Sequence, residues 1–389
     1  MNKKIKIVAD NKIPFLQGVL EPFADIVYLP PKEIIHENIK DADALLVRTR
    51  TDCNAKLLEG TNVKFIGTAT IGYDHIDAAY CDSKNIKWIN APGCNSSSVM
   101  QYIASALLTL AGREKYNLHE MTIGIVGVGN VGSKVARLSK ALGMNVLLND
   151  PPRERIEGKE NFIPLDELID KSNIITFHVP LIKDGVDKTY HLADDQFFEK
   201  LKEKKILFNT SRGEVVSTSS LKNAVKNKII AKSVIDVWEN EPNIDRELLD
   251  LVNIATPHIA GYSADGKANG TAICVREISS FFNLGISKEW YPTSIPAPGN
   301  HKELIFECKG KTRQEIVSEV ILATYDISKD DETFRKSVDT FEKQRGDYPV
   351  RREFPFYQIK LLNSTQDLNM TMTDLGFNLV NHLTQKYER

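Results

Sequence analysis

The sequence predicts an α/β protein with two parallel-sheet domains in tandem and a smaller C-terminal unit of mixed α+β character. Its length of 389 residues is too great for one ordinary domain. Short β-branched runs alternate with helical patterns from the first residues almost to position 260, which predicts parallel sheets joined by crossover helices. A break near Ala91-Pro92-Gly93 divides this alternation into two series.

The first series contains five candidate strands, which are Ile5–Ala9, Ile26–Leu29, Ala44–Arg48, Lys64–Ala69 and Ile86–Ile89. After the break, Ser98 and Gln101 have the spacing of a capping box, which predicts a helix over Val99–Ala111. The second series contains a helix at Val131–Leu142 and six candidate strands, which are Thr122–Val126, Asn145–Leu148, Ile174–Phe177, Ile206–Asn209, Lys232–Val237 and Asn253–Thr256. Two such series predict two α/β domains with a cleft between them.

Beyond the second series, the helical stretch Asp265–Leu284 is expected to return the chain to the first domain. The Pro-rich segment Tyr291–Gly299 then predicts a linker, and the remaining residues predict the third, smaller unit.

The composition says little about function, but it argues against several kinds of partner, namely nucleic acid, membranes and metal ions. A net charge of -2, with 26% charged and 42% apolar residues, gives no general reason to expect nucleic acid or an acidic membrane. The longest apolar stretch, Ile103–Ala111, is too short to span a bilayer, and the N-terminus lacks the apolar core of a signal peptide. Five scattered cysteines without CxxC spacing argue against a disulfide framework or a metal site and favour thiols in a reducing cytoplasm.

A dinucleotide fingerprint follows the strand Thr122–Val126. It consists of Gly127, Gly129 and Gly132, with Asn130 and Val131 opening the next helix, whose N-terminal N–H groups would face a pyrophosphate. Asp150, after the next strand, is placed to accept both ribose hydroxyl protons, which favours NAD over NADP, although Arg153 and Arg155 lie nearby. A glycine-rich turn without a ligand is the alternative, but strand, helix and Asp150 in register favour the cofactor.

Three further motifs lie at or just past strand ends, where open α/β sheets bind ligands. They present Arg212, Glu241 and His258. A guanidinium can hold a carboxylate bidentately, an imidazole can take a hydroxyl proton, and a carboxylate can orient that imidazole. Each residue alone has a structural explanation, but their joint occurrence on successive strand ends indicates oxidation of a 2-hydroxy acid.

These motifs, with Gly72-Tyr73-Asp74-His75, Ser211-Arg212-Gly213, Glu241-Pro242 and Pro257-His258, resemble the D-isomer-specific 2-hydroxyacid dehydrogenases over roughly residues 1–285. The resemblance implies that Arg212 binds the substrate carboxylate, Glu241 supports His258, and His258 is the acid/base. It also implies a Rossmann-like NAD domain (99–265) inserted in a flavodoxin-like substrate domain (1–98 and 266–288), followed by a C-terminal domain (289–389).

A narrower resemblance covers essentially the whole chain. Gly67-Thr-Ala-Thr70, Ala91-Pro-Gly-Cys94-Asn95, Asp150-Pro-Pro-Arg153 and the segment Phe341–Glu353 resemble the erythronate-4-phosphate dehydrogenases of vitamin B6 biosynthesis. That group implies 4-phospho-D-erythronate as substrate, a C-terminal dimerisation domain that makes a homodimer, and a tightly held cofactor recycled by a 2-oxo acid.

The same resemblance places substrate contacts at Thr49, Thr70 and Tyr262, to which the loop position adds Ile71 and Gly72. It places Val179, Asp236 and Gly261 at the cofactor, and His178 at a strand end is expected to form a wall of that pocket. His75 is expected to be structural. Arg48 and Arg50 are as well explained by a solvated loop end as by a phosphate site.

The tail arginines Arg345, Arg351 and Arg352 interleave with Tyr348 and Phe354, which favours a dimer face over nucleic acid because the chain has no net basic charge. Approach to the phosphate site of a partner subunit is the alternative. Two other functions stay open: another dehydrogenase of the family, such as a 3-phosphoglycerate or D-lactate dehydrogenase, and an NADH-sensing corepressor that shares the fold.

Overall fold

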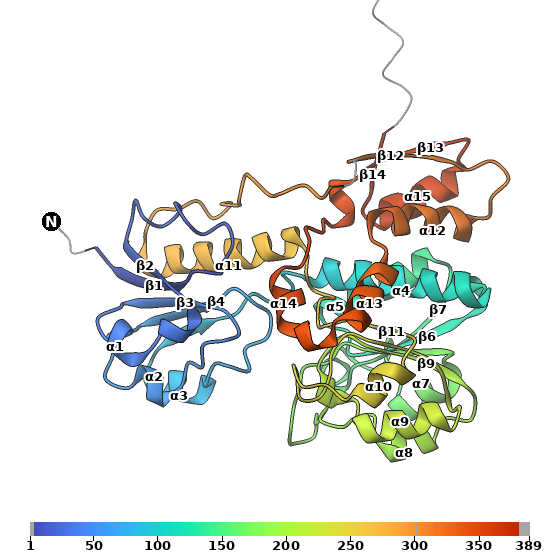
Figure 1. Cartoon of the computed structure of the whole chain (residues 1–389), viewed down its shortest axis with the longest axis horizontal. Helices are drawn as coiled ribbons and strands as arrows, with labels where there is room; N and C mark the ends of the chain where they lie inside the picture. The colour runs from blue at the N-terminus through green and yellow to red at the C-terminus, as the bar shows by residue number, and fades with distance from the viewer. Residues whose placement is uncertain (1–3, 300–301, 381–389) are drawn as a thin grey trace, which may run out of the picture. The chain divides into compact units, whose positions relative to one another are not determined.

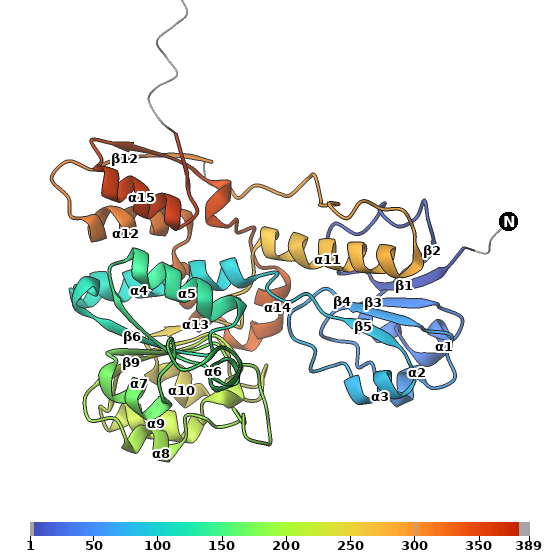
Figure 2. The same cartoon turned by 180° about the vertical axis from the view of Figure 1, so that it is seen from behind.

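The computed structural model describes residues 4–299 and 302–380. In this part of the chain three sheets form, and every strand pair in them is parallel (Figures 1 and 2). The contacts divide the chain into two compact units. The first comprises Met1–Asn95 and Ser263–Pro296, and the second comprises Ser96–Tyr262 and Ala297–Arg389.

The first unit contains a five-stranded sheet in the order β2-β1-β3-β4-β5. Its strands are β1 (Lys6–Asp10), β2 (Asp25–Leu29), β3 (Ala44–Val47), β4 (Phe65–Thr68) and β5 (Lys87–Ile89). Its helices are α1 (His36–Ile39), α2 (Ala55–Leu58), α3 (Ala78–Ser83) and α11 (Ala264–Phe282). Helices α2 and α11 lie on opposite sides of this sheet (Figure 1). Alternate strand residues face opposite sides, so Leu45 shares a core with Leu57 and Leu58 of α2, while Leu46 shares one with Val275 of α11. Thus the predicted return segment forms α11 and completes this core.

The second unit contains a six-stranded sheet in the order β11-β10-β9-β8-β6-β7. Its strands are β6 (Thr122–Val126), β7 (Asn145–Asn149), β8 (Ile174–Phe177), β9 (Lys205–Asn209), β10 (Ile230–Ile235) and β11 (Ile254–Ala255). The strand order reverses between β6 and β8, and the carboxyl ends beside such a reversal are where open α/β sheets bind ligands.

Helices cover both faces of this sheet. Those on one face share a core with Ile123 and Ile125 and are α4 (Ser96–Glu114) and α5 (Asn130–Ala141). Those whose side chains pack on the other face, with Ile175 and Leu207, are α7 (Leu165–Lys171), α8 (Asp195–Glu199), α9 (Thr218–Lys226) and α10 (Arg246–Leu251). A short helix, α6 (Pro151–Glu157), follows β7. The predicted α/β class with Rossmann-like sheets is therefore confirmed.

The C-terminal segment forms a third sheet, of β12 (Glu303–Glu307), β13 (Gln358–Leu362) and β14 (Asn378–Leu379). Its helices are α12 (Arg313–Thr324), α13 (Ile327–Lys336), α14 (Phe341–Gly346) and α15 (Gln366–Asp374). It is not a separate compact unit, because Val317 and Ile321 of α12 and Tyr357 share one buried core with Tyr102 and Leu107 of α4. The three-domain boundaries predicted from the sequence stay a prediction.

The capping box predicted at Ser98 and Gln101 is wrong. Helix α4 begins earlier, at Ser96, so both residues lie inside it and are buried. The Ser98 hydroxyl donates to the Glu353 carboxylate at 2.8 Å, and the Gln101 amide donates to the Arg352 carbonyl at 3.0 Å. These polar side chains join α4 to the C-terminal segment, a use that local spacing does not reveal.

Candidate active site

The glycine loop between β6 and α5 has the shape of a phosphate cradle. Gly127 has a φ of +87°, and a Cβ there would lie 2.6 Å from the carbonyl oxygen of His178. A Cβ on Gly132 would lie 2.0 Å from the carbonyl oxygen of Gly127, so helix and turn approach too closely for a side chain. Gly129 differs, because nothing lies within 4 Å of its Cβ position. The loop is therefore tight where it packs and open where a pyrophosphate would approach, beside the N-terminus of α5.

Asp150 fixes this loop against the next strand. One carboxylate oxygen accepts the N–H of Val128 at 2.8 Å, and the other accepts the N–H of Arg153 at 3.0 Å, capping α6. The Arg153 guanidinium donates to the carbonyl of Val128 and forms an ion pair with Glu157. Each oxygen of Asp150 keeps acceptor capacity, so the structure leaves room for the predicted ribose contact while adding a second task, holding the glycine loop.

His178 follows β8 and faces two threonine hydroxyls. Its Nε2 lies 2.9 Å from the hydroxyl of Thr176, and its Nδ1 lies 3.4 Å from that of Thr210. Burial lowers the pKa of His178 to about 3, so the imidazole is neutral. Val179, the next residue, packs against Gly127 and offers only apolar or backbone contact. A neutral wall beside the glycine loop is what these residues provide.

Arg212 is held by the turn that follows β9. The amide of Asn209 donates to the Arg212 carbonyl at 2.8 Å, and its oxygen accepts both the N–H and the hydroxyl of Ser211. A Cβ on Gly213 would lie 2.0 Å from the carbonyl carbon of Trp238. The turn bearing Arg212 therefore packs directly on the loop that leads to Glu241.

His258 and Glu241 form a hydrogen-bonded pair. The Nδ1 of His258 donates to a Glu241 oxygen at 2.7 Å, while the other oxygen accepts the N–H of Trp238 at 2.9 Å. Within residues 4–299 and 302–380, the Nε2 atom makes no hydrogen bond, and the imidazole is 30% exposed. Because an ionised carboxylate only accepts, the proton of neutral His258 resides on Nδ1 and leaves Nε2 as a base.

The charge state of Glu241 suits this pairing. Burial raises the pKa of the Glu241 carboxyl, but the positive charge and hydrogen bond of His258 and the N–H of Trp238 outweigh burial and hold the pKa below its usual value. The carboxylate therefore stays ionised and stabilises an imidazolium when His258 takes a proton.

Asp236 binds the histidine loop from behind. Its buried carboxylate accepts the hydroxyl of Thr256 and the N–H groups of Ile259 and Ala260, between 2.6 and 2.9 Å. Burial raises the pKa of Asp236 despite these bonds and the nearby charge of His258. The backbone N–H of His258 also donates to the Asp236 carbonyl at 2.7 Å, and His258 adopts a φ of +57°. Asp236 thus shapes the loop that presents His258, Gly261 and Tyr262.

Sequence reasoning missed the support from the C-terminal segment. The buried Arg351 donates to the carbonyls of Ile259 and Ala260 and stacks on Tyr325, with its guanidinium carbon 4.4 Å from the ring centre. Tyr348 meets the Tyr262 ring edge-on at 6.0 Å. Arg351 therefore lies inside the unit and not on the dimer face predicted for it. Its distance in sequence from Ile259 left no local signal that could have revealed this contact.

The residues predicted in the first unit form a neutral hydroxyl network. The hydroxyl of Thr70 donates to the Gly72 carbonyl at 3.0 Å and lies 2.8 Å from that of Thr68. Thr68 in turn lies 3.1 Å from Nε2 of the buried His75, whose pKa burial lowers. The Ile71 carbonyl accepts the amide of Asn90 at 2.7 Å. His75 is therefore structural, as expected.

Thr49 and the arginines beside it lie at the end of β3. Thr49 and Arg50 are exposed, and Arg48 is half-buried and donates to the Lys12 carbonyl at 3.3 Å.

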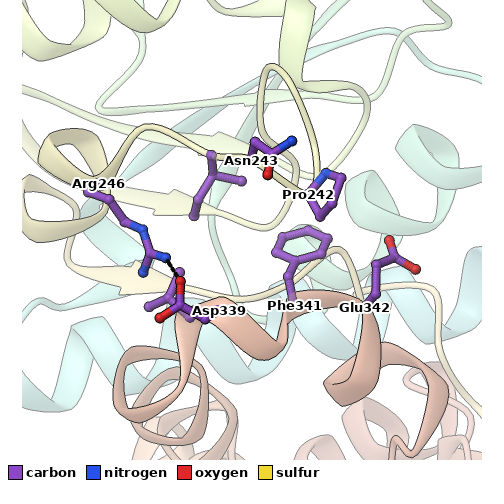
Figure 3. A pocket seen from close by; sticks show the side chains of 8 residues that line it. Pro242, Asn243, Arg246, Asp339, Phe341 and Glu342 are labelled. Carbon is purple, nitrogen blue, oxygen red and sulfur yellow. Dashed lines mark hydrogen bonds and ion pairs between the residues drawn. The ribbon is translucent and has the colours of Figure 1, made fainter.

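Two of the hollows formed by described residues of the second unit contain none of Arg212, Glu241 and His258. One, of about 300 Å³, lies between the 242–246 loop and the 338–342 segment, which the Arg246–Asp339 ion pair joins (Figure 3). The other, of about 440 Å³, is lined by Pro257 and Tyr348 among others. The side chains around His258, and not these two hollows, define the candidate site.

Residues 4–299 and 302–380 form neither a cluster of metal ligands nor a membrane-spanning helix. No group of three or more His, Cys, Asp or Glu side chains is arranged to hold a metal ion. No helix in the same ranges combines the length and the apolar character needed to cross a membrane.

Known proteins that resemble this chain define the class of enzyme to which it belongs. Residues 104–260 match the family described as D-isomer specific 2-hydroxyacid dehydrogenase, NAD binding domain, and residues 302–376 match a domain of unknown function. A solved D-lactate dehydrogenase of Aquifex aeolicus, complexed with NAD and lactic acid, is 26% identical; the match covers 72% of this chain and 95% of that one, with a TM-score of 0.60. A cofactor-bound 3-phosphoglycerate dehydrogenase of Entamoeba histolytica is 25% identical, with 76% and 100% covered and a TM-score of 0.61.

Relatives along nearly the full length narrow the class. An erythronate-4-phosphate dehydrogenase of Bacteroides thetaiotaomicron is 51% identical over 356 residues, which is 91% of this chain and 99% of the relative. One of Escherichia coli O157:H7 is 38% identical over 384 residues, 97% and 99% of the two chains. The chain therefore belongs to the D-isomer specific 2-hydroxyacid dehydrogenase family, within the group of the erythronate-4-phosphate dehydrogenases. It is an NAD-dependent dehydrogenase, as the glycine fingerprint and the three strand-end motifs together predicted.

Proposed function

We propose that the chain oxidises 4-phospho-D-erythronate at carbon 2 to 2-oxo-3-hydroxy-4-phosphobutanoate, with NAD as hydride acceptor, a step of vitamin B6 biosynthesis. The observation that carries the chemistry is the His258–Glu241 pair, with Nδ1 bonded at 2.7 Å and Nε2 open. The relatives named above support the choice of substrate. No observation favours a 3-phosphoglycerate dehydrogenase or a corepressor over this function.

The residues divide the reaction among themselves. Arg212 would hold the substrate carboxylate with two parallel hydrogen bonds. His258 Nε2 would take the proton of the carbon-2 hydroxyl, and ionised Glu241 would stabilise the resulting imidazolium. The glycine loop and Asp150 would hold NAD, which would supply the hydride acceptor for carbon 2. The proton thus ends on His258, and the substrate loses two electrons with that hydride.

Binding roles are assigned to the residues predicted from the sequence. The cofactor-contacting set is Gly127, Gly129, Asn130, Val131, Gly132, Asp150, His178, Val179, Asp236 and Gly261. The substrate-contacting set is Thr49, Thr70, Ile71, Gly72, Arg212 and Tyr262. The open Cβ position of Gly129 and the neutral His178 support the first set, and the network around Thr70 supports the second.

A spectrophotometric assay tests the proposal. Purified enzyme with 4-phospho-D-erythronate and NAD should form NADH, and adding a 2-oxo acid should sustain turnover if the cofactor stays bound. The kcat/KM for 4-phospho-D-erythronate should exceed that for 3-phosphoglycerate and for D-lactate. A higher value for either competitor, or NADH binding without turnover of any 2-hydroxy acid, would refute the function.

Assembly and location are also proposed. We infer a homodimer formed through the C-terminal segment, where Ile305 of β12 and Met370 of α15 are each 59% exposed. Sedimentation equilibrium should give twice 43.7 kDa. A reducing cytoplasm is supported by the five cysteines, all of which are buried free thiols.

A further inference from the structure

Arg345 of α14 is a largely buried guanidinium with few partners. Its Nη1 donates to Glu342 at 2.8 Å, and the side chain is 19% exposed. Its Nε is buried and has no hydrogen-bond partner in residues 4–299 and 302–380. Buried polar groups are normally hydrogen-bonded, so the unpartnered Nε indicates that this guanidinium binds a further acceptor.

The position of Arg345 identifies the neighbourhood of that acceptor. Its guanidinium carbon lies 5.8 Å from the ring centre of Tyr262, four residues after His258, and 5.7 Å from that of Phe341. Its charge is also among the causes that lower the pKa of Glu241. Helix α14 thus lies beside the catalytic loops, and Figure 3 shows Phe341 and Glu342 facing Pro242.

We propose that Arg345 binds the phosphate of the substrate and so determines the preference for a phosphorylated 2-hydroxy acid. This inference rests on the proposed function. A phosphate dianion offers several acceptors with a geometry that matches the guanidinium fork. The competing Glu342 lies three residues earlier on the same helix and is 37% exposed, so its carboxylate can turn toward solvent when a dianion takes its place.

Arg351 is a different case. Its Nε and Nη1 are also buried without a hydrogen-bond partner in residues 4–299 and 302–380. Its Nη2, however, donates to the carbonyls of Ile259 and Ala260, and its guanidinium stacks on Tyr325 and Tyr348, so Arg351 serves to hold the loop. Of these two arginines, only Arg345 combines unused donors with contact to Tyr262. The C-terminal segment would therefore contribute a substrate-binding residue within its own chain.

The test compares two ligands that differ only in the phosphate. The affinity of the enzyme–NADH complex for 4-phospho-D-erythronate and for D-erythronate is measured by calorimetry, for wild type, Arg345→Gln and Arg345→Lys. Loss of a charge-assisted hydrogen bond should weaken binding of the phosphorylated ligand about 10- to 100-fold in Arg345→Gln, and less in Arg345→Lys. Binding of D-erythronate should change less than about 3-fold, because that ligand never used the contact.

Arg352→Gln is the matched control, since it removes the same charge from the same segment, where Arg352 stacks on Phe356 at 4.2 Å. It should leave both affinities unchanged. Equal losses for both ligands in Arg345→Gln, or a shifted pH profile of kcat with unchanged discrimination, would overturn the proposal by assigning Arg345 a structural or electrostatic role. Loss of discrimination in Arg48→Gln but not in Arg345→Gln would do the same. Failure of the wild type to turn over 4-phospho-D-erythronate would instead refute the proposed function itself.

Discussion

The two halves of the carboxyl edge of the six-stranded sheet use opposite chemistry. Around β6 and β8 the edge presents the backbone of the glycine loop, which Asp150 holds in place, and a His178 whose pKa burial lowers to about 3. Around β9 to β11 it presents charged groups, with His258 bonded to an ionised Glu241. The imidazole of His178 thus lies beside two threonine hydroxyls, whereas that of His258 is hydrogen-bonded to a carboxylate. One half of this edge is therefore suited to bind a cofactor, and the other half is suited to move a proton.

The largest expected effect comes from removing the imidazole of His258 from the charged half. His258→Ala should lower kcat by about 10²- to 10⁴-fold, the usual contribution of a positioned acid/base. NADH affinity, measured by fluorescence titration, should be nearly unchanged, because the glycine loop lies at the other half. His178→Asn is the control and should lower kcat less than about 10-fold, since a neutral wall residue transfers no proton. A near-normal kcat for His258→Ala would refute the acid/base assignment.

Arg212→Lys tests whether the turn after β9 belongs to the charged half. A lysine keeps the charge but loses the planar fork, so KM for the hydroxy acid should rise about 10- to 100-fold. NADH affinity should stay within about 3-fold of wild type, because the structure gives the glycine loop its own supports. Steady-state kinetics with the hydroxy acid varied, beside an NADH titration, give both values. Weakened NADH binding with an unchanged KM would move Arg212 to the cofactor half.

How much of this edge could be predicted depends on the range of the contacts. The parallel strands and their end loops followed from hydrophobic periodicity, and Glu241 and His258 meet because their loops follow neighbouring strands β10 and β11. The C-terminal supports could not be predicted. Ser98 resembled a cap, but its partner Glu353 is 255 residues away, and Arg351 lies 91 residues from Ala260. No local pattern encodes such pairs, which tertiary packing alone creates.

Gly129→Ala tests the neutral half without disturbing the fold. Nothing lies within 4 Å of the Cβ position, and φ is -74°, so the melting temperature should hold. A methyl group at the approach of the pyrophosphate should weaken NADH binding about 5- to 100-fold, because forcing a methyl group into a close contact costs about 1–3 kcal/mol. Gly112→Ala on α4, also with nothing within 4 Å, is the matched control and should leave NADH affinity unchanged. Equal NADH affinity in both variants would contradict the cradle.

The smallest expected effect comes from the neutral state of His178, which should change how the free energy of unfolding depends on pH. An unfolded histidine binds a proton below its ordinary pKa of 6.5, whereas folded His178 stays neutral down to about 3. Between these values the unfolded state binds more protons, so the free energy of unfolding falls as pH falls through that window. His178→Asn removes this contribution, so its melting temperature should fall less steeply than that of wild type between about pH 6 and 4. Above about pH 7 both folded and unfolded histidines are neutral, and the difference between the two proteins should not vary with pH. Scanning calorimetry across both pH ranges measures this difference. Parallel acid slopes for the two proteins would mean that folded His178 is protonated as readily as the unfolded residue, which would contradict the neutral character of this half of the edge.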